Sequence, residues 1–230
     1  FGTVNPIKKI IHKAHENGAI VLIDGAQTAP HSSVDVTEMD CDFYAFSGHK
    51  MLAPTGVGVL YGKSEFLESM DPFLGGGEMI QTVNMQTSTW NQIPWKFEAG
   101  TPNIAQVIGL GAAIEYLNRI GMENIHQYEQ ELLAYALREL AKIPQVVIYG
   151  SAPERGAVIS LNAGNVHPHD LAQFLDQEQI AVRAGHHCAQ PIMNKLQVSA
   201  TTRVSFYLYN RIDEIDRLCK GIRSAISFMG

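Results

Sequence analysis

The 230-residue chain is poor in cysteine, with only Cys41, Cys188 and Cys219. A small and odd number of cysteines argues against a disulfide framework and indicates a reducing compartment. We therefore expect a cytoplasmic location or a comparable one such as the plastid stroma.

Long hydrophobic runs and clusters of positive charge are also lacking. The apolar stretch "AIVLI" at 19–23 is far too short to span a bilayer, and no amino-terminal signal pattern is present. The net charge is -6 and the Lys and Arg residues are scattered, which argues against a nucleic acid or a membrane as partner. With 46% hydrophobic residues, the composition predicts a soluble globular protein of one large or two smaller domains.

The first half of the chain has the pattern of an α/β domain. It opens without an initiator methionine and enters an amphipathic helix after Asn5, which predicts that the natural protein begins further upstream. Strands are expected at 19–23, 42–46 and 57–62. The continuous apolarity of 19–23 favours a strand covered on both faces, as in a parallel sheet flanked by helices.

The second half has a different pattern. Residues 71–101 are rich in Gly, Thr, Asn and Gln, and predict an irregular or hairpin segment with a functional or interface role. Helices are expected at 103–121 and 122–142, and a mixture of short strands and helices follows to the end. We expect a part of a mostly parallel-sheet domain at 1–120 and a smaller α+β domain at 121–230.

Polar residues follow the first two strands, where α/β sheets build their ligand sites. Asp24 in "VLIDGAQTAPH" can face a cationic heterocycle, or it can simply cap the turn at Gly25. Lys50 in "FSGHK" can form a covalent bond with an aldehyde, or it can be a solvated surface lysine. Together, an Asp and a Lys at neighbouring strand ends fit pyridoxal phosphate, which offers both a pyridinium and an aldehyde.

The stretch "RAGHHCAQP" at 183–191 allows three interpretations: metal ligands, an activated thiol, or a loop with a buried sulfur. Adjacent His and Cys residues are poorly spaced for a tetrahedral zinc site, and no second cluster lies nearby in sequence. A thiol must lose its proton to attack, and the neighbouring His186, His187 and Arg183 favour the thiolate. Cys41 and Cys219 lie in apolar contexts, which predicts inert buried thiols.

These three motifs together resemble a known family. "DGAQTAPH" followed by "SGHK" is similar to the class V aminotransferase branch of fold-type I pyridoxal-phosphate enzymes, and "RAGHHCAQP" is similar to the SufS-like, group II cysteine desulfurases. The resemblance runs from Asn5 to the carboxyl end. It implies an α/β fold of that type, in which the chain holds part of the large domain and the small carboxyl-terminal domain.

The resemblance also implies roles for single residues. Lys50 corresponds to the lysine that binds the cofactor aldehyde, Asp24 to the partner of the pyridine nitrogen, and Gln27 to a donor to the ring oxygen. The residues implied to hold phosphate are Ser47 and His49, with Thr101 in "FEAGTPN" reaching the phosphate of a partner subunit in a homodimer. Arg203 in "TTRVSF" corresponds to the clamp for the substrate carboxylate, a task suited to a planar bidentate donor, and Arg183 is a second candidate for substrate or loop contacts.

The resemblance implies that Cys188 takes sulfur from L-cysteine, leaving alanine and a persulfide. A sulfur-acceptor protein of the SufE or SufU type would then clear the persulfide for iron–sulfur cluster assembly. Two alternatives stay open: a selenocysteine lyase, and a non-catalytic sulfur carrier, for which retention of Lys50 and Asp24 would have no purpose. The upstream part of the family's sequence is absent from this chain, including a phosphate-binding turn and a histidine that stacks on the cofactor ring.

Overall fold

The computed structural model describes all residues 1–230, and they form two compact units. The amino-terminal unit comprises Pro6–Met122, and the carboxyl-terminal unit comprises Phe1–Asn5 with Glu123–Gly230. None of the helices is long and apolar enough to cross a membrane. The interpretation of the two units as parts of a large and a small domain stays a prediction.

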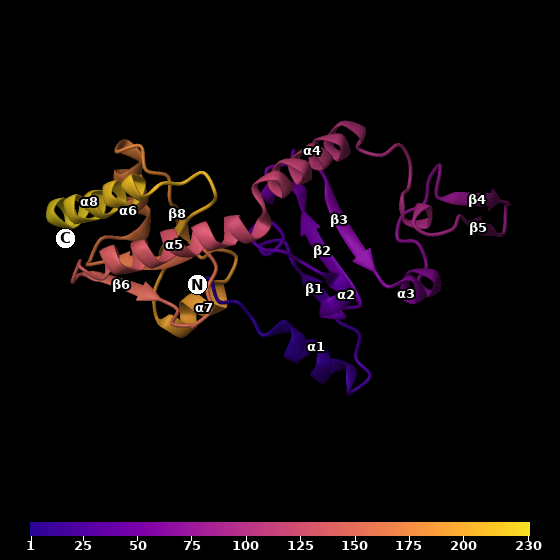
Figure 1. Cartoon of the computed structure of the whole chain (residues 1–230), viewed down its shortest axis with the longest axis horizontal. Helices are drawn as coiled ribbons and strands as arrows, with labels where there is room; N and C mark the ends of the chain where they lie inside the picture. Colours follow the sequence, from indigo (N-terminus) through magenta and orange to yellow (C-terminus); the bar gives the residue numbers. More distant parts are fainter. The chain divides into compact units, whose positions relative to one another are not determined.

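The amino-terminal unit is built around a small sheet (Figure 1). Its elements, in chain order, are α1 (Ile7–His15), β1 (Leu22–Asp24), α2 (Val36–Met39), β2 (Phe43–Ser47), the 3-10 helix η1 (Gly48–Lys50), β3 (Gly58–Gly62), α3 (Ser64–Ser69), β4 (Ile80–Val83), β5 (Ser88–Trp90), the 3-10 helix η2 (Trp95–Phe97) and α4 (Ile104–Ile120). The expected strands and helices of this half are therefore present.

The sheet has the order β1-β2-β3, and only its first pair is parallel. β2 and β3 are antiparallel. The prediction of a mostly parallel sheet thus holds for only one of the two pairings in this chain. The reason is the short connection 48–57, because a parallel crossover needs about a dozen residues or more.

The expectation that the first strand is covered on both faces is wrong for this chain. β1 is an edge strand, and Ile20 and Leu22 are 60% and 57% exposed. On the opposite face, Ile23 and Tyr44 pack with Ile11 of α1, and on the face of Leu22 the side chain of Phe43 is buried at the start of β2. Alternation of side chains along the strands therefore divides the sheet into one covered and one mostly open face.

A buried carboxylate ties α1 to the base of the sheet. Asp42, 3% exposed, accepts hydrogen bonds from the Val21 amide at 2.7 Å and from Lys63 at 3.0 Å, and lies 2.9 Å from His15 Nε2. Burial by itself would raise the pKa of Asp42, but these three partners outweigh it and lower the pKa to about 2. Asp42 is therefore a carboxylate at neutral pH.

We expected the Gly-rich segment 71–101 to be either irregular or a hairpin, and it contains a hairpin. β4 and β5 pair antiparallel, and Thr82 and Thr89 hydrogen-bond across them at 2.6 Å. The hairpin is open to solvent in this chain, with Met85 94% exposed.

The carboxyl-terminal unit is an α+β sandwich. Its elements are α5 (Met122–Leu140), β6 (Val146–Tyr149), β7 (Val158–Ala163), α6 (Pro168–Gln177), β8 (Arg183–Gly185), α7 (Gln190–Leu196), β9 (Thr201–Ser205) and α8 (Ile212–Met229). The sheet order is β6-β7-β9-β8, with every pair antiparallel. The helices α5, α6 and α8 bury their apolar faces with β7 in the main core, which contains Leu132, Ile159, Leu171 and Ile222.

Candidate functional site

Two polar positions meet at one edge of the amino-terminal sheet. β1 ends at Asp24 and the parallel strand β2 ends at Ser47, and Asp24 is in register with Ala45. The Gly25 amide continues the pairing by donating to the Ala45 carbonyl at 2.8 Å. Asp24, Ala45 and Ser47 therefore share the carboxyl-terminal edge of the parallel pair, the place where α/β sheets bind ligands.

The structure shows the turn-capping interpretation of Asp24, and its role toward a cationic heterocycle stays a prediction. One carboxylate oxygen accepts from the Ala26 amide at 3.0 Å, so Asp24 does cap the turn. The residue is exposed, as is Gln27 on the same turn, so both side chains stay accessible to a ligand. The cap fixes the carboxylate and leaves lone pairs of its second oxygen free.

Gly25 holds this turn close to the sheet. It is buried, and a Cβ added there would lie 1.9 Å from Cζ of Tyr44. Only glycine lets the backbone after Asp24 lie against the Tyr44 ring, so Tyr44 supports the turn from beneath. This contact could not be predicted from the sequence, because only the strand pairing brings Gly25 and Tyr44 together.

Lys50 is held by a rigid turn rather than by a flexible loop. Ser47 leads directly into η1, in which Lys50 is half-buried and His49 is exposed. The Gly48 amide donates to the Val57 carbonyl at 2.9 Å, and a Cβ at Gly48 would come within 2.8 Å of Val57 Cγ1. The glycine in "SGHK" is thus required by the close approach of the next strand.

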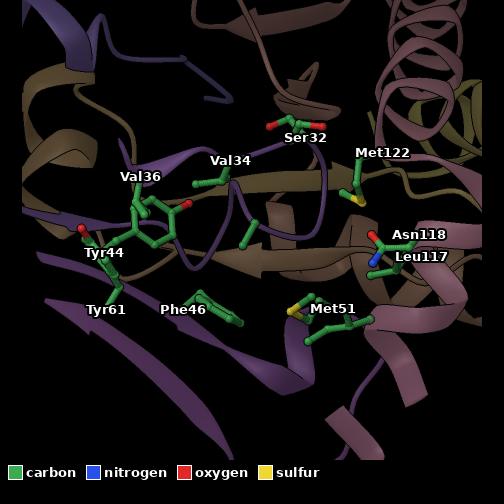
Figure 2. A pocket seen from close by; sticks show the side chains of 13 residues that line it. Ser32, Val34, Val36, Tyr44, Phe46, Met51, Tyr61, Leu117, Asn118 and Met122 are labelled. Carbon is green, nitrogen blue, oxygen red and sulfur yellow. The ribbon is translucent and has the colours of Figure 1, made fainter. Parts of the chain in front are cut away.

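A cavity of about 370 Å³ lies on the covered side of the same sheet. Figure 2 shows Tyr44 and Phe46 of β2 among its lining, with Leu117 of α4. None of the predicted site residues lines it. Since Ala45 and Ser47 alternate with Tyr44 and Phe46, the cavity and the predicted cofactor residues belong to opposite faces.

Thr101 lies in the loop between η2 and α4 and is exposed. The adjoining Gly100 has a φ of +81° and its amide donates to the Gly77 carbonyl at 2.9 Å. This contact joins the end of the glycine-rich segment 71–101 to its glycine run at 75–77. The role of Thr101 toward a partner subunit stays a prediction.

In the carboxyl-terminal unit, Cys188 lies in a tight turn between β8 and α7. His187 and Cys188 both have positive φ, +54° and +60°, and the Ala189 amide donates to the His186 carbonyl at 2.9 Å. Positive φ at both central residues is the pattern of a type I′ turn, which normally uses Asn and Gly. For two residues with larger side chains the conformation costs about 1–3 kcal/mol each, and such strain is concentrated at functional sites.

Two arginines accompany this thiol. The Arg183 guanidinium donates to Cys188 Sγ at 3.7 Å, and Cys188 is exposed, whereas Cys41 and Cys219 are buried. Arg183 and Arg203 are direct partners across β8 and β9. Burial and the neighbouring Arg183 lower the pKa of Arg203, and its Nε is buried without a hydrogen-bond partner. An arginine pair facing an exposed thiol is suited to an anionic ligand.

His187 does not supply the positive charge that the sequence suggested. Its Nε2 lies 3.0 Å from the Thr201 carbonyl oxygen and 2.9 Å from Thr201 Oγ1. Burial lowers the pKa of His187, so the imidazole is neutral at pH 7. The charge beside Cys188 therefore comes from arginine. No three His, Cys, Asp or Glu side chains gather as a set of metal ligands.

The residues of the amino-terminal unit fit pyridoxal phosphate by the chemistry of their donors. An anchored carboxylate suits a protonated ring nitrogen, a lysine suits an aldehyde, and Ser47 with His49 offers donors for a phosphate. Ala45, the register partner of Asp24, adds only a methyl group at this edge of the sheet. These residues fit the cofactor, and we treat its binding by this chain as a proposal.

The comparisons with known proteins agree with the fold. The family model "Aminotransferase class-V" matches residues 1–218, so the chain belongs to the class V aminotransferase family. A probable cysteine desulfurase of Halalkalibacterium halodurans is 54% identical over 230 residues, covering 100% of this chain and 56% of that protein. The chain thus spans little more than half the length of this relative.

Solved structures place the fold in the same group. The crystal structure of the Escherichia coli cysteine desulfurase CsdA, in an S-sulfonic acid form, matches with a TM-score of 0.95 and 41% identity, covering 100% of this chain and 57% of that one. A mutant of the lyase C-DES, with glycine covalently linked to its PLP cofactor, matches with a TM-score of 0.82 and 27% identity, covering 96% of this chain and 57% of that one. The family is PLP-dependent.

Proposed function

We propose that this chain carries the catalytic groups of a cysteine desulfurase, which transfers sulfur from L-cysteine to Cys188. The observation that carries the proposal is the contact between Arg183 and the exposed Cys188 thiol, which follows the end of β8. Arg203 of β9 lies directly opposite Arg183 in the sheet. Lys50 and Asp24 supply the complementary part, because a simple sulfur carrier needs neither.

Pyridoxal phosphate, when bound, would supply an electron sink for the charge that develops on the substrate. Asp24 would hold the ring nitrogen in its protonated form, Gln27 would donate to the ring oxygen, and Ser47 and His49 would hold the phosphate. Lys50 would hold the aldehyde and, once its amine is free, remove the proton from the substrate α-carbon. Thr101 would reach the phosphate of the partner subunit in a homodimer.

Arg203, with Arg183 beside it, would bind the substrate carboxylate and fix its orientation. The Cys188 thiolate would attack the sulfur of the substrate. An S–S bond forms, the C–S bond breaks, and its electron pair passes to carbon, which is then protonated. L-cysteine and the Cys188 thiol thus become L-alanine and a Cys188 persulfide, with no external oxidant or reductant. The exposed turn leaves the persulfide open to an acceptor protein of the SufE or SufU type in iron–sulfur cluster assembly.

The experiment is to incubate the full chain with pyridoxal phosphate and L-cysteine, then measure alanine and map persulfides by mass spectrometry after alkylation. We expect one alanine per sulfur transferred and a persulfide on Cys188 alone. Cys188→Ser should abolish the persulfide, while Cys41→Ser and Cys219→Ser serve as matched controls that keep it. A persulfide on a different cysteine contradicts the proposal, and activity with selenocysteine alone would identify a selenocysteine lyase instead.

A further inference from the structure

The direction of the Cys188 side chain depends on a turn that its residues do not favour by themselves. Both central residues, His187 and Cys188, have positive φ, and neither is Gly or Asn. The turn is closed by a single backbone hydrogen bond between His186 and Ala189. Such a conformation persists only where other contacts hold it.

His187 makes the contact that can hold it. A carbonyl oxygen can only accept, so the 3.0 Å contact with the Thr201 carbonyl is a hydrogen bond when the hydrogen lies on His187 Nε2, and Thr201 Oγ1 at 2.9 Å can accept from the same N–H. Thr201 is fully buried and lies opposite Gly185 in the β8–β9 pair. The imidazole therefore ties the turn to a rigid point of the sheet.

The protonation state of His187 is defined by the same surroundings. Nδ1 is buried and has no hydrogen-bond partner, so a second proton would bury an unsatisfied N–H. Burial also lowers the pKa of this imidazole. His187 is thus a neutral donor, and it is half-buried whereas the adjacent His186 is exposed.

We propose that His187 is the positioning residue of the sulfur-accepting cysteine: its bond to Thr201 stabilises the turn that holds Cys188 Sγ against Arg183. This inference rests on the proposed function, because that function makes Cys188 the sulfur-accepting residue. The geometry that it describes belongs to the carboxyl-terminal unit alone and needs no cofactor.

The experiment compares two alkylating reagents on the full chain without cofactor. Iodoacetate is an anion and iodoacetamide is neutral, so the ratio of their rates reports positive charge beside the thiol and cancels a general change in exposure. Cys41 and Cys219 are buried, so Cys188 is the thiol that reacts in the native chain. The variant Arg183→Ala provides the reference value of this rate ratio for a Cys188 thiol that lacks the neighbouring positive charge.

We expect His187→Ala and His187→Gly to lower the ratio roughly fivefold, the effect of losing one unit charge about 4 Å away in water. The lowered ratio should equal the ratio of Arg183→Ala. The double variant His187→Ala with Arg183→Ala should have this same ratio and no lower one. His186→Ala is the matched control and should keep the wild-type ratio. Glycine adopts positive φ freely. A His187→Gly variant with the wild-type ratio would therefore show that the turn forms without the imidazole, and it would overturn the proposal.

A second measurement needs no variant. Long-range proton–nitrogen correlation spectra of the wild-type chain at neutral pH should show His187 as the neutral tautomer with its hydrogen on Nε2. An imidazolium or the Nδ1–H tautomer would overturn the proposal. Both experiments are independent of cofactor binding, so failure of the desulfurase assay leaves their outcome unchanged.

Discussion

Arg183 of β8 and Arg203 of β9 occupy directly opposed positions in an antiparallel pair. Like charges placed opposite each other destabilise a sheet, and here one of them is half-buried with an unpartnered Nε. The side-chain hydrogen bond of Arg183 goes to Cys188 Sγ rather than to a carboxylate. We interpret the pair as a built anion site, whose cost to stability is offset when a carboxylate binds.

This relationship predicts that Arg203→Gln does not weaken the fold. Removing one of two opposed charges should leave the free energy of unfolding unchanged or raise it by up to about 1 kcal/mol, and the gain should shrink as salt screens the pair. Urea unfolding at low and high salt measures this. A loss above about 2 kcal/mol would mean that Arg203 is a structural residue.

A second prediction concerns the pH dependence of the amino-terminal unit. The pKa of Asp42 is about 2 in the folded chain, below the usual value of about 3.9, so the folded state favours the carboxylate. Its contribution to stability is therefore complete above about pH 4 and is lost as the pH falls toward 2. Acid unfolding of the wild-type chain should show this loss.

Asp42→Asn should lower the free energy of unfolding at pH 7 by about 1–3 kcal/mol and remove the corresponding acid sensitivity. The matched control is Asp40→Asn, because Asp40 shares Lys63 as a partner but is exposed. It should have the smaller effect. Equal effects of the two substitutions would show that burial of Asp42 is unimportant.

A third prediction tests the support of the Asp24 turn. Gly25→Ala places a Cβ 1.9 Å from the Tyr44 ring, so it should destabilise the chain by about 1–3 kcal/mol. Gly111→Ala is the control, since an added Cβ there meets nothing within 4 Å in the middle of α4. Combining Gly25→Ala with Tyr44→Leu should recover part of the loss. Thermal unfolding of the four variants, including Tyr44→Leu alone, decides this.

The order of strands and helices could be predicted from sequence because periodicity and turn residues act locally. Asp24 and Ser47 do end their strands, since an apolar run stops where polar residues begin. The antiparallel third strand also follows from a local property, the shortness of the 48–57 connection, although we predicted a mostly parallel sheet. Local patterns were therefore sufficient for the elements but not for every pairing.

The contacts that orient the site could not be predicted. The bond from His187 to Thr201 and the packing of Tyr44 under Gly25 join residues 14 and 19 positions apart. The sequence suggested a cationic His187 because His, Arg and Cys are adjacent in "RAGHHC". In the folded unit, burial lowers the pKa of His187 and keeps the imidazole neutral. The burial of a single residue cannot be read from its neighbours in the sequence.

The proposed function depends most directly on covalent binding of pyridoxal phosphate by Lys50. The full chain is mixed with the cofactor, its absorbance is recorded, and the sample is reduced with borohydride before peptide mapping, with Lys50→Ala and the exposed-lysine variant Lys9→Ala treated in parallel. We expect one cofactor trapped on Lys50 in the wild-type and Lys9→Ala chains, and none in Lys50→Ala. Labelling that is spread over surface lysines, or that survives in Lys50→Ala, would contradict this expectation.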